Sequence, residues 1–164
     1  MAWKTSVLVV ANQTADSPEL IEALQQRAAE GEAEFTLLLP PLPGHREEAR
    51  VRVEEIVGGW REAGLEARGE VGDSDPIVAV KEGWDPGRYD EVVVSTLATG
   101  VSKWLQIDLP RRVERITGVG VRHVIGTTAE KHDEAAPPPA VRRPPKPRGL
   151  EHWLGAPRRG TKPD

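Results

Sequence analysis

The sequence predicts one doubly wound α/β domain built on a parallel sheet of five strands. Short apolar runs alternate with helical patterns five times along residues 1–127, and this alternation is typical of strand-helix-strand units with right-handed crossovers. Two of the runs, residues 5–11 and 91–95, are rich in β-branched residues, as expected of strands covered on both faces. Beyond residue 127 the periodicity stops, so we assign residues 128–164 to a tail.

The first half of the domain has clear starts and stops. After the strand at 5–11, Ser17 is a suitable N-cap and Pro18 a suitable first helical residue, while Gly31 can end that helix. A second buried strand is expected over 34–39, where the following prolines stop it.

The middle of the chain predicts a long helix and a weak strand. Apolar residues share one face of a helix over 46–63. Residues 65–71 alternate poorly and carry several charges, which favours a strand at an exposed edge of the sheet.

The second half contains the remaining elements. Residues 73–76 start a short helix that ends near Trp84, a turn follows at 85–87, and 91–95 is the fourth strand. Residues 101–107 are expected to be helical, Asp108 to cap a further helix over 111–116, and 121–125 to be the fifth strand. The order 3-2-1-4-5 places the two most apolar strands at the centre and the polar third strand at an edge.

Composition excludes several classes of protein. There are no cysteines, so disulfides, thiolate metal sites and cysteine catalysis are excluded. No run of apolar residues is long enough for a membrane span and the N-terminus does not resemble a signal peptide; we therefore expect a cytoplasmic protein without membrane association. Residues 1–128 carry 14 Lys and Arg against 21 Asp and Glu, which makes nucleic acid an unlikely partner.

The tail differs in character from the domain. Residues 136–164 contain 8 of the 15 prolines and 7 Lys and Arg against 2 Asp and Glu, so extended polyproline-like backbone is expected. We expect the apolar residues of 150–154 to pack against the acidic domain or a neighbouring subunit. The alternative is a free tail that binds an anionic partner.

Five segments of residues 5–126 form a recognisable succession: VLVVANQTADSP, EFTLLLP, GEVGDSDPIVAV, YDEVVVSTLATGVSKWLQIDLPRRVER and GVRHVIG. Through these segments the chain resembles the universal stress proteins. The resemblance implies the adenine-nucleotide alpha hydrolase-like fold, a homodimer formed through the fifth strand and a role in stress responses. It also implies a loop after the fourth strand that cradles the phosphates of ATP.

This phosphate loop departs from the family pattern. Ser95, Ala98 and Asp108 stand where the family has its three glycines, and Leu109 where it has Ser or Thr. Asn12 takes the place of an aspartate that contacts the nucleotide. Glycines allow the backbone to approach an anion closely, whereas the carboxylate of Asp108 repels one. The chain thus resembles a variant branch, and we expect ATP binding to be weakened or lost.

Polar residues nevertheless follow the first and fourth strands, where strand order reverses and ligands bind in open α/β sheets. The candidate ligand-binding residues are Asn12, Gln13, Thr14, Ser95, Thr96, Thr99, Gly100 and Ser102. The alternative is that these groups cap helices and satisfy their own turns. His123, within the fifth strand, is expected to point to solvent or to a neighbouring chain.

Two functions follow from these observations. The first is a small-ligand or nucleotide-binding module, with an adenine nucleotide or a small anion as candidate ligand and no certain cofactor. The second is a homodimeric interaction protein that does not bind nucleotides and whose tail contacts a partner subunit. The sequence has no catalytic triad order, metal-ligand spacing or Walker loop, so we expect no enzymatic activity.

Overall fold

The computed structural model describes residues 3–98 and 102–127. The chain divides into two units, Met1–His132 and Asp133–Asp164, and every described residue lies in the first. The predictions for the proline-rich tail therefore fall outside the described residues. The elements are β1 (Thr5–Val10), α1 (Pro18–Glu30), β2 (Ala33–Leu39), α2 (Arg46–Glu62), β3 (Glu66–Val71), α3 (Pro76–Gly83), β4 (Glu91–Thr96), α4 (Lys103–Gln106), α5 (Leu109–Thr117) and β5 (Val121–Ile125).

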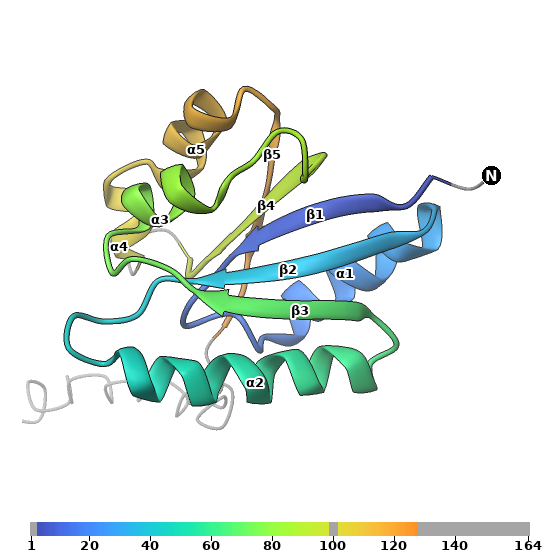
Figure 1. The fold of residues 1–164 in the computed structure, drawn as a ribbon, viewed down its shortest axis with the longest axis horizontal. Coiled ribbons are helices and arrows are strands. Elements are labelled where there is room, and N and C mark those ends of the chain that lie inside the picture. Colours follow the sequence, from blue (N-terminus) through green and yellow to red (C-terminus); the bar gives the residue numbers. More distant parts are fainter. Residues whose placement is uncertain (1–2, 99–101, 128–164) are drawn as a thin grey trace, which may run out of the picture. The chain divides into compact units, whose positions relative to one another are not determined.

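The five strands form one parallel sheet in the order β3-β2-β1-β4-β5, as predicted (Figure 1). Helices α1 and α2 cover one face, and α3 and α5 cover part of the other. The strand order reverses between β1 and β4, because the chain moves from β1 toward β3 on one side and from β4 to β5 on the other.

Strand β1 supplies both layers of the core. Val7 and Val9 pack with Leu20 and Leu24 of α1 and with Trp60 of α2. The intervening residues of β1 pack on the opposite face with α3 and α5, in a cluster that contains Leu8, Val10, Leu38, Val80, Leu109 and Val113. Side chains alternate between the two faces of a strand, so a strand covered on both faces is apolar at every position, which is how β1 was recognised.

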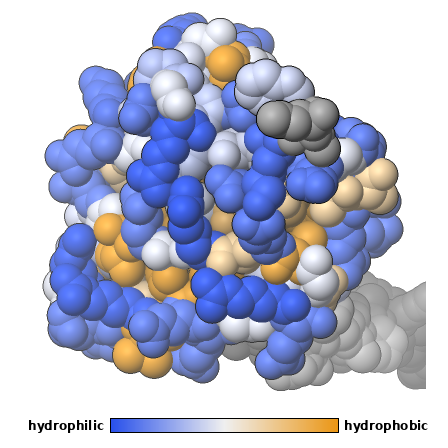
Figure 2. Space-filling view, turned by 45° about the vertical axis from the view of Figure 1, so that its right-hand side comes forward, coloured by the Kyte–Doolittle hydropathy of each residue, from blue (hydrophilic) through white to orange (hydrophobic). Residues whose placement is uncertain are grey.

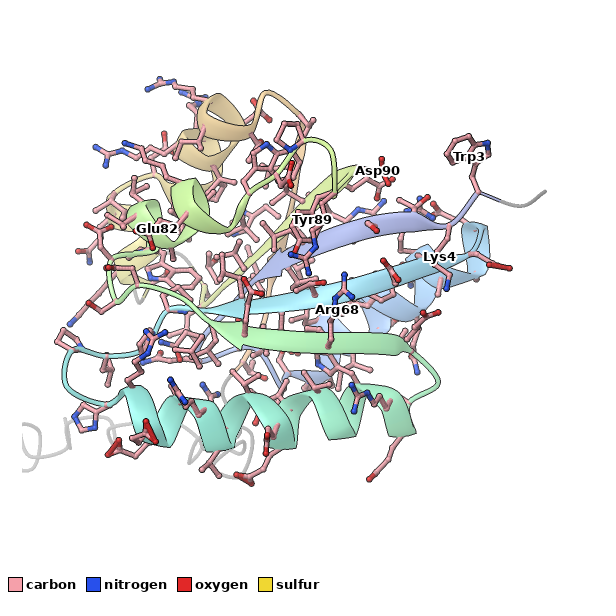
Figure 3. All side chains as sticks on the ribbon, viewed as in Figure 1. Trp3, Lys4, Arg68, Glu82, Tyr89 and Asp90 are labelled. Atoms are coloured by element: carbon pink, nitrogen blue, oxygen red, sulfur yellow. The ribbon has the colours of Figure 1, made fainter. Side chains whose placement is uncertain are left out.

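The edge position of β3 is also confirmed, and the sheet is polar there. Arg68 of β3 donates from Nε to Thr36 Oγ1 of β2 (3.2 Å), and Lys4 lies 2.9 Å from Glu66 (Figure 3). On the opposite face, Gly69 lets α2 approach closely, because a Cβ there would come within 2.6 Å of Val53 Cγ1. Charge on one face and a close helix on the other explain the weak apolar pattern of this strand.

The surface seen in Figure 2 is predominantly hydrophilic, with apolar side chains visible only in small groups between charged ones. In the described part of the chain, no helix has both the length and the apolar character that crossing a membrane requires.

Two helix predictions need correction at the residue level. Asp108 stands at the N-cap of α5, but its side chain makes no capping hydrogen bond; its Oδ2 lies 3.9 Å from Arg111 Nε instead. Its backbone has a φ of 53°, a left-handed conformation that favours glycine. The helix expected over 101–107 is shorter, at Lys103–Gln106, and α5 begins two residues earlier than expected, at Leu109.

Candidate functional site

The candidate site lies at the carboxyl ends of β1 and β4. Helix α1 follows β1 on one face of the sheet, and α5 lies beyond β4 on the other. The loops that leave these neighbouring strands therefore diverge. Such a divergence opens the crevice in which open α/β sheets bind their ligands.

A buried pair of hydroxyls joins the loop after β1 to the end of β4. Thr14 Oγ1 and Ser95 Oγ are 2.6 Å apart, and both residues are almost completely buried. They are 81 positions apart in sequence, yet each satisfies the other.

Thr96 is held by a second, independent set of hydrogen bonds. Its hydroxyl donates to the Leu97 carbonyl (2.8 Å) and lies 2.7 Å from His123 Nε2. With the hydroxyl proton directed to the Leu97 carbonyl, the contact is satisfied when the histidine donates, in the form that carries a proton on Nε2.

His123 is exposed, as expected, and its ring also contacts Thr96 of the neighbouring strand β4. The contact with Thr96 fixes the ring on the sheet, while the residue as a whole stays exposed on β5. Burial lowers the pKa of this histidine below its ordinary value, because desolvation disfavours the imidazolium.

Asn12 and Gln13 follow β1 and behave differently. The Asn12 amide donates from Nδ2 to the Pro40 carbonyl (2.7 Å) and accepts at Oδ1 from Arg52 Nη1 (2.9 Å). Gln13 is exposed. Asn12 thus ties together the loops after β1 and β2, while Gln13 faces outward.

Ser102 lies beyond the β4 loop and is nearly buried. Its hydroxyl accepts from the Leu105 backbone nitrogen (3.2 Å) and caps α4. The two candidates Thr99 and Gly100 lie outside the described residues. Among the described hydroxyls of the predicted site, each has a partner within the domain.

Sequence reasoning missed two residues at this end of the sheet. Arg52 of α2 reaches Asn12; it is spaced three and four positions from the buried Ala49 and Ile56, which is the signal that could have placed it at the border of the buried face. Gly126 follows β5 and donates to the Thr96 carbonyl (2.9 Å). A Cβ there would lie 3.0 Å from Ser17 Cβ, so only glycine fits without a shift.

A separate cavity of about 440 Å³ lies at the opposite, amino end of the sheet. It is lined by Arg27, Glu30, Glu91, Val92, Gly120, Val121 and Arg122. The charge of Arg27 is already matched there, because its guanidinium donates to both carboxylate oxygens of Glu91 at 2.9 Å. Of the predicted ligand-binding residues that the structure describes, none lines this cavity.

Comparisons with known proteins identify the fold. No protein-family model matches the sequence, and no curated protein matches it. The structure of the universal stress protein from Archaeoglobus fulgidus gives a TM-score of 0.53 at 13% identity, covering 73% of this chain and 93% of that one. A universal stress protein in complex with cAMP gives 0.55 at 22% identity, covering 77% and 100%.

The Archaeoglobus fulgidus protein in complex with dAMP gives a TM-score of 0.54 at 14% identity, covering 76% of this chain and 99% of that chain. The domain therefore has the universal stress protein fold, which is the adenine-nucleotide alpha hydrolase-like fold predicted from the sequence.

Proposed function

We propose that this chain is a universal-stress-type protein that binds an adenine nucleotide, or another small anion, at the carboxyl ends of β1 and β4. The observation that carries the proposal is the fold, shared with universal stress proteins solved in complex with cAMP and dAMP. It is supported by the amide, hydroxyl and guanidinium groups that this chain gathers at the same end of the sheet.

The proposed ligand carries few phosphates. Asp108 keeps a backbone conformation typical of glycine, with a φ of 53°, but brings a carboxylate to the loop that cradles the phosphates of ATP in the family. The charge repels additional phosphates, and the glycine at this position that would allow close backbone approach is absent. AMP or a cyclic nucleotide is accordingly a better ligand than ATP.

The proposed activity is binding without catalysis. A hydroxyl nucleophile needs a base within hydrogen-bond reach. The Thr14 and Ser95 hydroxyls contact each other, and His123 donates to Thr96 rather than accepting from it. This arrangement supports regulation by ligand binding; the cytoplasmic location and the stress role stay predictions from the sequence.

A homodimer through β5 is part of the proposal. Among the described strands β5 pairs only with β4, and its residue Ile125 is 49% exposed. An open strand edge is commonly covered by pairing with another chain. This edge also supports the second candidate function, an interaction protein without a nucleotide. Light scattering at micromolar concentration should report a dimer, and a monomer would contradict this part of the proposal.

A thermal-shift screen of the full chain tests the ligand. AMP, cyclic AMP, ADP, ATP and inorganic phosphate are compared at equal concentration. A ligand present at 100 times its dissociation constant adds about 2.7 kcal/mol of stability. We expect the largest shift with AMP or cyclic AMP and the smallest with ATP. No shift with any nucleotide would overturn nucleotide binding and favour the interaction protein.

A further inference from the structure

Among the described residues, Arg52 is a basic side chain that reaches the loop carrying Asn12, Gln13 and Thr14. It extends from α2 to the loop after β1, where Nη1 donates to Asn12 Oδ1 at 2.9 Å. Asn12 in turn donates to the Pro40 carbonyl after β2. The guanidinium is thereby held at the carboxyl ends of β1 and β2.

Most donors of this guanidinium are not used by the domain. An arginine carries five N–H groups, and among the described residues the hydrogen bond to Asn12 is the one that Arg52 makes. The carboxylate of Asp16 forms an ion pair with this guanidinium, with Oδ1 3.9 Å from Nη2, but the distance is too long for a hydrogen bond, so it occupies none of the N–H donors. The Arg52 side chain is 35% exposed, so the remaining donors can be reached by a ligand.

Arg46, on the same helix, shows the contrasting case. Its two amino nitrogens donate to the backbone carbonyls of Gly72 (3.0 Å) and Val71 (3.3 Å). Those bonds fasten the start of α2 to the end of β3. Arg46 is thus a structural arginine, whereas Arg52 is fixed at one nitrogen and has donors to spare.

We propose that Arg52 binds the anionic group of the ligand, so that the phosphate lies on the β1–β2 side of the crevice rather than on the loop after β4. This inference rests on the proposed function and specifies where the charge of the nucleotide is recognised. Guanidinium groups bind phosphate through paired, charge-assisted hydrogen bonds. The segment between α4 and α5 instead carries the carboxylate of Asp108, which lies 3.9 Å from Arg111 Nε.

The consequence is a preference for nucleotides over nucleosides that depends on one side chain. AMP carries the phosphate and adenosine does not, while the rest of the two molecules is identical. Removing the guanidinium should therefore lower the affinity for AMP and leave the affinity for adenosine unchanged. A residue that only supports the fold would change both affinities together.

The test is calorimetric titration of the full chain with AMP and with adenosine. The variants are Arg52→Gln, Arg52→Lys and, as a matched control, Arg50→Gln. Arg50 lies on the same helix and loses the same charge, but it is exposed and pairs with Glu47 at 3.6 Å. Thermal unfolding of each variant checks that the fold is retained.

In Arg52→Gln we expect AMP affinity to fall roughly 10- to 100-fold, the range for a charged hydrogen bond, with adenosine affinity unchanged. Arg52→Lys should retain part of the preference for AMP, and Arg50→Gln should stay within about twofold of the wild-type chain for both ligands. An unchanged ratio of AMP to adenosine affinity in a folded Arg52→Gln would overturn this inference and leave the proposed function standing. Failure of the wild-type chain to bind either molecule would overturn the proposed function itself.

Discussion

The two sides of the crevice differ in whether their polar groups already have hydrogen-bond partners within the domain. On the β4 side, Ser95, Thr96 and Ser102 have partners inside the domain, and Asp108 adds a negative charge. On the β1–β2 side, Asn12 holds Arg52 by one nitrogen and leaves other donors exposed. The comparison teaches that hydroxyl groups gathered at a strand end are not by themselves a binding surface. What matters for a ligand is which donors remain after the protein has satisfied its own.

The largest expected effect comes from the side chain that supports the β1 loop. Trp60 is fully buried and donates from Nε1 to the Ala15 carbonyl at 3.0 Å. Trp60→Ala should lower the free energy of unfolding by about 3–5 kcal/mol, as measured by denaturant titration. Trp60→Phe keeps most of the volume and removes the hydrogen bond, so its loss should be smaller. Equal losses in the two variants would show that packing is not what Trp60 supplies.

The Thr14–Ser95 pair tests whether the β4 side is closed by its own contacts. Thr14→Val and Ser95→Ala should each cost about 1–3 kcal/mol, because each leaves a buried hydroxyl without its partner. The double variant should cost less than the two single costs added together, since no orphaned hydroxyl remains. Strict additivity in a double-mutant cycle of unfolding free energies would indicate that the two hydroxyls do not interact.

The features that could be predicted from the sequence are those set by residues close together in the chain. Strand order, the cap Ser17 and the helix start within residues 73–76 were predicted because apolar runs and capping preferences are local. The contact between Thr14 and Ser95 was not, because it joins residues 81 positions apart. Arg52 was missed because it lies among charged residues that look like a solvated helix face. The conformation of Asp108 was missed because a positive φ is uncommon outside glycine.

The carboxylate of Asp108 provides a test of the β4 side of the crevice. Asp108→Gly removes the carboxylate and relieves the left-handed backbone, so ATP affinity should rise, by about tenfold for a charge removed near a phosphate. Ala98→Gly, in the loop between β4 and α4, removes no charge and should raise ATP affinity less. Titration of both variants with ATP and AMP measures the difference. A larger gain from Ala98→Gly would contradict the electrostatic explanation.

The smallest expected effect concerns pH. Burial lowers the pKa of His123 in the folded chain, so the unfolded chain binds the proton more readily. This histidine therefore contributes stability above its unfolded pKa of about 6.5, and that contribution is lost as the pH falls through the lower folded value. The Thr96 contact survives protonation because Nε2 already donates. The melting temperature of each chain is measured between about pH 5 and 8. As the pH falls, the melting temperature of His123→Gln should fall slightly less than that of the wild-type chain. Parallel curves for the two chains would exclude His123 as the cause.

The central claim is that the ligand lies at the carboxyl ends of β1 and β4, and backbone amide shifts in the NMR spectrum of the full chain, titrated with AMP, test it directly. We predict that the perturbed amides concentrate at residues 11–17, 95–98 and around Arg52. Shifts that instead concentrate around Glu30, Gly120 and Arg122, at the cavity on the amino side of the sheet, or the absence of any shift, would contradict the account.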